Sequence, residues 1–156
     1  MGQISKLTNM GDMRKDKNIK PDNRPAKKPG IYKIYMPKET LLKLCGKKIN
    51  VDKLEKKIDV LKNLVLVYIG LSKKLSNRIC SDHLRGDHTS SSVQNRIKKF
   101  LEDSKKDSSK ESIKNIIDLC WVEWEYVDSE WIGTKEQVEI ATHYLPFNTK
   151  NNEDGC

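Results

Sequence analysis

Side chains alternate regularly along LCWVEWEYV, residues 119–127, and this is the strongest strand signal in the chain. Trp121, Glu123, Glu125 and Val127 fall on one side of an extended backbone, and the residues between them fall on the other. A period of two residues is typical of a strand whose two faces meet different surroundings. We therefore expect a β-strand here.

Two earlier segments also have the composition of strands. GIYKIYM, residues 30–36, is rich in β-branched and aromatic side chains and is followed by Pro37, which stops a strand. LVLVYI, residues 64–69, is followed by Gly70, where we expect the second strand to end.

Helical patterns fill much of the space between the predicted strands. Residues 38–63 are expected to form a helical insert. Leu54, Ile58 and Leu61 recur at helical spacing, and Asn50 is a candidate N-cap. Leu71, Leu75 and Ile79 form an apolar stripe after the second strand, which predicts a helix that ends at Gly86. Another helix is expected to begin near Ser91, with Val93, Ile97, Phe100 and Leu101 turned inward.

The C-terminal part predicts a loop, a turn and one more helix. Residues 106–112 have the composition of an exposed loop, and residues 113–118 are expected to form a short turn. A capping box at Thr134 and Gln137 predicts the start of the last helix, which Pro146 stops. The order of elements predicts an α+β domain with a small, mainly antiparallel sheet.

The chain is basic, and its charge is unevenly spread. Its 156 residues suit one domain, with a net charge of +8 and a pI of about 9.2, so the first expected partner is an anion. Residues 1–28 lack periodicity and are expected to form a flexible basic arm, either an ordinary disordered terminus or an arm that follows phosphates. The domain is expected at 29–150, followed by a tail at 151–156.

The cysteines and the hydropathy exclude several classes. The four cysteines are far apart and form no CxxC pair, which argues against a zinc knuckle. No apolar run is long enough to cross a membrane, and no signal peptide is recognisable, so we expect an intracellular protein with no membrane partner.

Two tyrosine triplets carry a resemblance to a known family. Gly30-Ile31-Tyr32 and Tyr68-Ile69-Gly70 are followed in order by an arginine ten residues after the second tyrosine, a histidine about a turn later, and a helix with a glutamate. These residues are Arg78, His83 and Glu136, and Pro146 and Asn148 come after them. Over residues 30–148 the sequence resembles the GIY-YIG nuclease family.

The resemblance implies a fold, an activity and a set of site residues. It implies a three-stranded antiparallel sheet flanked by helices, and hydrolysis of DNA phosphodiester bonds with one divalent ion, Mg²⁺ or Mn²⁺. The implied catalytic residues are Tyr32, Tyr68, Arg78, His83, Glu136 and Asn148. Glu136 would also hold the metal, Gly30 and Gly70 would be structural, and Lys73, Lys74 and Arg85 would bind DNA.

The chemistry of these residue types agrees with that reading. An arginine braces two phosphate oxygens at once. A single carboxylate suits Mg²⁺, because this ion keeps several waters and takes further ligands from phosphate. A phenol or an imidazole relays a proton. We expect Tyr32 to be the proton acceptor, with its pKa lowered by Arg78 and a metal, and His83 to be the rival base.

The sequence departs from the family pattern at three places. The segment between the triplets, residues 33–67, is long, as in restriction-type members. The family histidine commonly stands four residues after the arginine, but here that position is Asp82 and His83 is five residues after. A π-type bulge would bring His83 back toward the arginine. The third departure is Glu139, which lies one turn after Glu136 and is an alternative metal ligand.

Two functions from different classes follow from the sequence. The first is a metal-dependent endonuclease of restriction or mobile-element type, for which a homodimer is expected if both strands are cut. The second is a DNA-binding module that has the nuclease fold and does not cut.

Overall fold

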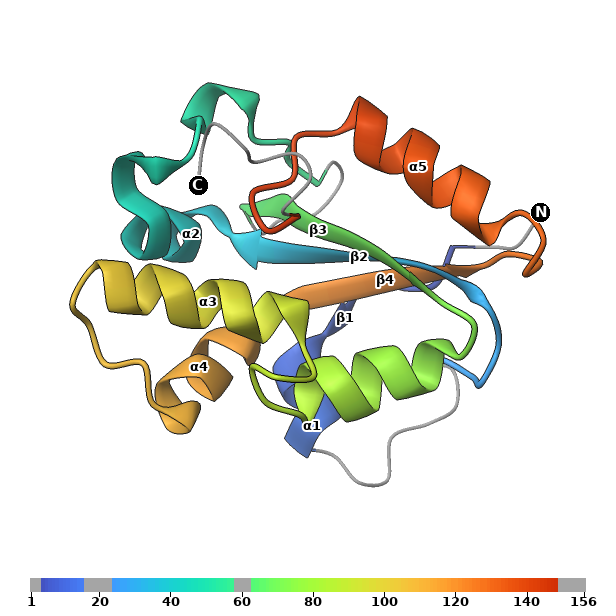
Figure 1. Ribbon diagram of the computed structural model, residues 1–156, viewed down its shortest axis with the longest axis horizontal. Coiled ribbons are helices and arrows are strands. Elements are labelled where there is room, and N and C mark those ends of the chain that lie inside the picture. Colours follow the sequence, from blue (N-terminus) through green and yellow to red (C-terminus); the bar gives the residue numbers. More distant parts are fainter. Residues whose placement is uncertain (1–3, 16–23, 58–62, 149–156) are drawn as a thin grey trace.

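The computed structural model describes residues 4–15, 24–57 and 63–148, and it has an α+β architecture (Figure 1). Its strands are β1 (Thr8–Asn9), β2 (Gly30–Pro37), β3 (Leu64–Ser72) and β4 (Trp121–Tyr126). Its α-helices are α1 (Met10–Lys15), α2 (Lys38–Cys45), α3 (Ser92–Asp103), α4 (Lys110–Ile117) and α5 (Ile132–Thr142). Two 3₁₀ turns, η2 (Gly46–Lys48) and η3 (Val51–Lys53), and a π-helix, η4 (Asn77–Leu84), complete the described elements.

The sheet has four antiparallel strands in the order β1-β4-β2-β3, so the expected number of three is wrong. β2 is central and pairs along its length with both β3 and β4. The extra strand, β1, pairs Thr8 with Val122 and Asn9 with Trp121 at the far edge of β4. β3 lies at the opposite edge of the sheet.

Helices cover both faces of the sheet (Figure 1). On one face, α5 packs over an apolar cluster that includes Ile31, Ile69 and Ile132. On the other face, η4, drawn in light green, lies with α3 and α4 over a larger cluster that includes Ile34 and Ile97. The alternation of β2 explains this division, because Ile31 and Tyr35 face α5 while Tyr32, Ile34 and Met36 face η4.

The N-terminal residues are part of the fold wherever the structure describes them. Met10 and Met13 of α1 are buried in the larger apolar cluster, at 0% and 3% exposure. Arg14 forms an ion pair with Asp118, which fastens α1 beside the end of α4. A flexible arm is therefore the wrong description of residues 4–15, because their apolar side chains find partners that are distant in sequence. Residues 1–3 and 16–23 of the expected arm lie outside the described residues.

The region between β2 and β3 is less helical than expected. α2 ends at Cys45, where Gly46 has a φ of 57° that favours glycine. Asn50 does cap a turn, because its side chain accepts a hydrogen bond from the N–H of Asp52, but this turn is only the short η3. Leu54 is outside the helix, and the expected helical residues Ile58 and Leu61 lie outside the described residues.

Helix boundaries in the C-terminal half also differ from expectation. α3 begins next to Ser91, as predicted, Ser91 is its N-cap, and its four expected apolar residues are buried. Residues 110–117 form α4, whose N-cap is Ser109, where a loop and a turn were expected. α5 begins at Ile132, so Thr134 and Gln137 lie inside the helix and do not form its capping box. No helix in the described ranges is long and apolar enough to cross a membrane.

Candidate active site

Tyr32 and Tyr68 lie on the same face of the sheet, with ring centroids 5.9 Å apart. A register shift between Ile34 and Tyr35 of β2 gives β3 one extra residue at this point. The bulge turns Val67 and Tyr68 toward the same side, whereas strict alternation would have placed them on opposite faces. The two phenols therefore meet because of an irregularity in β3.

The helix after β3 is a π-helix, which is the type of winding that would bring His83 back toward Arg78. The N–H of Arg85 bonds to the carbonyl of Cys80, five residues earlier, at 3.2 Å. This wider winding allows Arg78 and His83, which are five residues apart, to point toward one side. The centroid of the His83 ring is 5.3 Å from that of Tyr32 and 5.8 Å from that of Tyr68.

Three side chains form a buried chain of hydrogen bonds. The Tyr32 hydroxyl lies 2.6 Å from His83 Nε2, and His83 Nδ1 lies 2.6 Å from Ser91 Oγ. A neutral imidazole has one donor and one acceptor nitrogen. If the phenol donates to Nε2, then Nδ1–H donates to Ser91 Oγ, which also accepts from the N–H of Gln94. Ser91 therefore caps α3 and orients His83 at the same time.

Burial determines which of these groups carry charge. Burial, with a smaller contribution from the positive charge of Arg78, lowers the pKa of His83 to about 3, so the imidazole is neutral near pH 7. Burial also raises the pKa of Tyr32 well above its ordinary value, and Tyr68 adds to this effect. Arg78 lowers the pKa of Tyr32, as expected, but burial outweighs it. The further lowering expected from a bound metal, and the choice between Tyr32 and His83 as proton acceptor, stay predictions.

Arg78 and Tyr68 connect this buried chain to the surface. Arg78 Nη1 donates to Asp82 at 3.1 Å and to the carbonyl of Ser90 at 3.3 Å, and about a third of its side chain is exposed. Burial favours the neutral form of Arg78, but Tyr32, Asp82 and Tyr68 outweigh this and raise its pKa above the ordinary value. The Tyr68 hydroxyl accepts a hydrogen bond from Ser92 Oγ at 2.8 Å. Arg78 is thus a charged group that a phosphate can reach.

The two glycines of the triplets permit close packing at the site. Gly70 pairs across the sheet with Tyr32, and a Cβ atom at Gly70 would lie 2.5 Å from the Tyr32 hydroxyl. A Cβ at Gly30 would collide with the carbonyl of Glu125 and the side chain of Leu75. These contacts agree with the structural role that the resemblance implies for both glycines.

We expect Gly70→Ala to destabilise the protein by about 1–3 kcal/mol, because the fully buried Tyr32 ring has to move away from the new methyl group. Gly133→Ala is the matched control, since nothing lies within 4 Å of its Cβ position in α5 and alanine favours a helix by about 0.5–1 kcal/mol. Urea unfolding of both variants measures this difference. Equal stability of the two variants would contradict the packing argument.

Asn148 fastens the strand that carries Tyr68. Its side-chain oxygen accepts from the N–H of Ile69 at 3.0 Å, and its amide nitrogen donates to the carbonyl of Ile69 at 2.9 Å. Both ends of the amide are thus bound to the backbone of the edge strand, and the residue is 8% exposed. Because Ile69 directly follows Tyr68, these contacts support a role for Asn148 in positioning Tyr68. Its catalytic role stays a prediction.

Glu136 and Glu139 lie on α5, across the sheet from η4. Glu136 is four residues after Ile132 and four before Ile140, both of which pack against the sheet, so it shares their face of the helix. Glu139 is already bound to Lys33 at 3.3 Å and to His143 at 3.0 Å. The assignment of the metal ligand to Glu136 rather than Glu139 stays a prediction.

A metal site at Glu136 would be sparse in protein ligands. Among residues 4–15, 24–57 and 63–148, no three His, Cys, Asp or Glu side chains form a group that could hold a metal ion. A single carboxylate is compatible with Mg²⁺ or Mn²⁺ when water and a phosphate complete the coordination sphere. The donor set thus fits an ion that is held jointly by the protein and the substrate.

The residues predicted to bind DNA are all exposed. Lys73 and Lys74 lie in the turn between β3 and η4, where Ser72 Oγ accepts from the N–H of Lys74. Arg85 follows the last residue of η4. The structure leaves these three side chains accessible, and their contact with DNA stays a prediction.

Sequence reasoning missed the roles of Ser91 and Ser92. Ser91 was recognised only as the start of a helix, and Ser92 was not considered. The available signal was the run TSSS at residues 89–92, directly before an amphipathic helix and a few residues after His83. A run of hydroxyl side chains at an N-cap predicts hydrogen bonds, but it does not reveal that two of them bind the imidazole and the phenol.

Comparison with known proteins agrees with this arrangement. No curated protein and no solved structure shows a significant match to the chain. The family model described as the GIY-YIG catalytic domain matches residues 30–156. This range includes both tyrosine triplets, the π-helix with Arg78 and His83, and the α5 glutamates. The chain therefore belongs to the GIY-YIG catalytic domain family, a family of nucleases.

Proposed function

We propose that this protein is a metal-dependent endonuclease that hydrolyses phosphodiester bonds in DNA. The observation that carries the proposal is the hydrogen-bonded chain of Tyr32, His83 and Ser91 beside the charged side chain of Arg78. Phosphodiester hydrolysis needs a group that takes a proton from water and a cation that stabilises the extra negative charge of the transition state. This cluster supplies both.

Arg78 binds the phosphate first. Its ion pair with Asp82 is partly exposed, and such pairs contribute little, so a phosphate with two oxygens can replace the carboxylate. Tyr32 has no exposed surface, so water reaches its hydroxyl only when the neighbouring side chains move as the substrate binds. Displacement of Arg78 from Asp82 is the movement that opens this path.

Tyr32 and His83 then act as one unit. The Tyr32 hydroxyl takes the proton of the attacking water while it passes its own proton to His83 Nε2. Bound phosphate neutralises the charge of Arg78 and so removes one of the two causes that lower the pKa of His83. The imidazole becomes a stronger base when substrate is present. Ser91 holds the ring in the orientation that this transfer needs.

A divalent ion at Glu136 would neutralise charge on the phosphate and assist the leaving oxygen. The chain would contribute the Glu136 carboxylate from α5, which packs over β3 on the face opposite the phenols. We propose further that the enzyme belongs to the restriction or mobile-element type and acts on both strands as a homodimer. The long segment between β2 and β3 supports the first part, because it supplies surface beyond the minimal strand connection.

Incubation with supercoiled plasmid DNA and Mg²⁺ tests the proposal. We expect nicked and linear products with Mg²⁺, and none with excess chelator. Sequencing of the product ends separates recognition of a defined site, which gives discrete fragments, from unspecific cutting, which gives a smear. If DNA binds tightly and no product forms with Mg²⁺ or Mn²⁺, the protein is a binding module. Tyr32 would then stay buried even when DNA is bound.

A further inference from the structure

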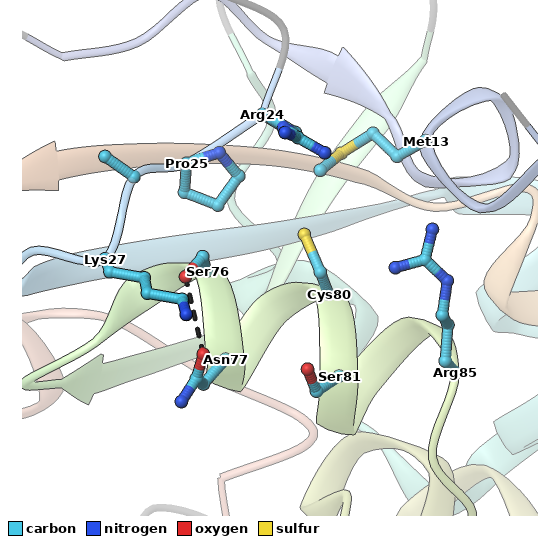
Figure 2. Close-up of a pocket in the computed structure, with 10 residues that line it drawn as sticks. Met13, Arg24, Pro25, Lys27, Ser76, Asn77, Cys80, Ser81 and Arg85 are labelled. Atoms are coloured by element: carbon cyan, nitrogen blue, oxygen red, sulfur yellow. Dashed lines mark hydrogen bonds between the residues drawn. The ribbon is translucent and has the colours of Figure 1, made fainter. Parts of the chain in front are cut away.

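A concave site lies beside η4, on a side where neither Arg78 nor Asp82 contributes to the lining (Figure 2). The pocket has a volume of about 490 Å³, and residues 24–27 form one wall while η4 forms the other. The N–H of Ser76 bonds to the carbonyl of Ala26 at 3.2 Å, and the N–H of Leu75 bonds to that of Lys28 at 3.0 Å. These bonds connect the two walls of the pocket.

Three cations and no acid line this pocket. Arg24, Lys27 and Arg85 are exposed at its rim, and none of the lining residues is Asp or Glu. Within the described ranges, none of the three forms an ion pair, whereas the carboxylate of η4, Asp82, is bound to Arg78. Positive charge is therefore concentrated here without a counterion from the described chain.

Two of the three cations, Arg24 and Arg85, lie near the Cys80 thiol. Figure 2 shows this thiol pointing from η4 toward residues 24–25, with the side chain of Arg85 beside it. Arg85 and Arg24 each lower the pKa of the thiol, although burial outweighs them and raises it overall. Both guanidinium groups are thus close enough to act on one site, although 61 positions separate them in the sequence.

Neutral hydrogen-bond donors complete the lining. The Ser76 hydroxyl donates to the side-chain oxygen of Asn77 at 3.5 Å, which leaves the amide N–H groups of Asn77 available. Ser81 adds another hydroxyl. A pocket with two guanidinium groups, an ammonium and several neutral donors fits a small anion that has several acceptor oxygens.

We propose that this pocket binds a phosphate of the DNA strand outside the scissile bond, which rests on the function proposed above. η4 carries Arg78 for the reacting phosphate, and the pocket lies along the same helix. A helix with its side chains is about 10–12 Å across. The second phosphate would therefore lie on the same strand, separated from the scissile phosphate by roughly the width of this helix. Because the rim of the pocket is open, the pocket suits a phosphate of a strand that crosses the helix better than it suits a free anion, which would need an enclosed site.

DNA affinity measured in a chelator, where no cutting occurs, tests the pocket. Each of Arg24→Ala and Arg85→Ala should weaken binding of a short duplex on the order of tenfold, and the slope of log K against log salt should become less steep by about 0.9. Lys47→Ala is the control. This exposed side chain lies in η2, so the substitution removes the same charge at a position away from the pocket. We expect its affinity to change less than twofold. Thermal melting of each variant checks that it is folded.

Alkylation of Cys80 gives a second test that needs no mutation. Cys80 is partly exposed, while Cys45 and Cys120 are buried, and peptide mass spectrometry assigns the modified thiol. Bound duplex should slow alkylation of Cys80 at least fivefold, and inorganic phosphate should slow it much less.

The outcomes separate this site from the catalytic proposal. The pocket proposal would be overturned if DNA binds, Cys80 is alkylated as fast as without DNA, and the arginine variants behave like Lys47→Ala. That result would leave the proposed cutting activity untouched. Protection by inorganic phosphate without protection by DNA would also overturn it, in favour of a small-anion site. Protection by DNA together with weakened arginine variants would support the pocket even if plasmid cutting failed. A wild-type protein that binds no DNA would refute both proposals.

Discussion

Tyr32→Phe is expected to slow single-turnover cleavage by about 10²–10⁴, the range that general acid–base groups contribute, with DNA affinity almost unchanged. The substitution removes only the hydroxyl that lies 2.6 Å from His83 Nε2. The ring stays in its buried position against Gly70, so the fold should survive. It should lose about 1–3 kcal/mol of stability, because a buried imidazole nitrogen loses its partner.

Tyr35→Phe is the matched control for this prediction. Tyr35 is on the same strand but on the opposite face, buried at 5% exposure, and its hydroxyl donates to Glu123 at 2.5 Å. The control therefore removes an equally buried and hydrogen-bonded phenol that has no place in the cluster. We expect it to lose stability and to cut at nearly the normal rate.

His83→Ala should be as slow as Tyr32→Phe, and the double variant should be little slower than either single one. This follows because the two side chains form one proton path and do not act separately. On a regular α-helix the five-residue offset would turn His83 away from Arg78 and predict a smaller effect, and the observed π-helix removes that reason. Near-normal cutting by Tyr32→Phe beside an inactive His83→Ala would exclude the phenol from the path.

Glu136→Gln is expected to abolish cleavage below detection, while DNA binding persists. The amide keeps the size of the side chain but removes the negative charge that a divalent ion needs. Binding should persist, because the exposed cations Lys73, Lys74 and Arg85 are unchanged. Plasmid nicking and duplex affinity, measured on the same preparation over a range of Mg²⁺ concentrations, test both parts.

Glu139→Gln is the control for Glu136. Glu139 is one turn away on the same helix and is bound to Lys33 and His143, so its loss removes ion pairs without touching the proposed metal site. We expect a modest loss of stability and a normal dependence on Mg²⁺. An inactive Glu139→Gln beside a mildly affected Glu136→Gln would reverse the assignment.

The sequence was sufficient where the signal is local. Alternation at residues 119–127 and the β-rich run at residues 30–36 predicted β4 and β2, because a side-chain period follows directly from backbone geometry. The two triplets, with Arg78 at its offset, led to the family that the domain comparison confirms. The five-residue offset of His83 left open whether the helix bulges after Arg78, and the structure shows the π-type winding that brings the two side chains together.

Tertiary structure alone decided the features that depend on partners distant in sequence. Thr8 and Asn9 form a strand that is too short to have a pattern of its own, and only β4 defines it. The bulge in β3, which turns Tyr68 toward Tyr32, arises from the pairing register and leaves no mark in an apolar run. The charge states of Tyr32 and His83 also depend on burial, which raises one pKa and lowers the other because a low-dielectric interior disfavours any charged form. A sequence shows which groups can ionise, whereas the packing around them determines which of them do.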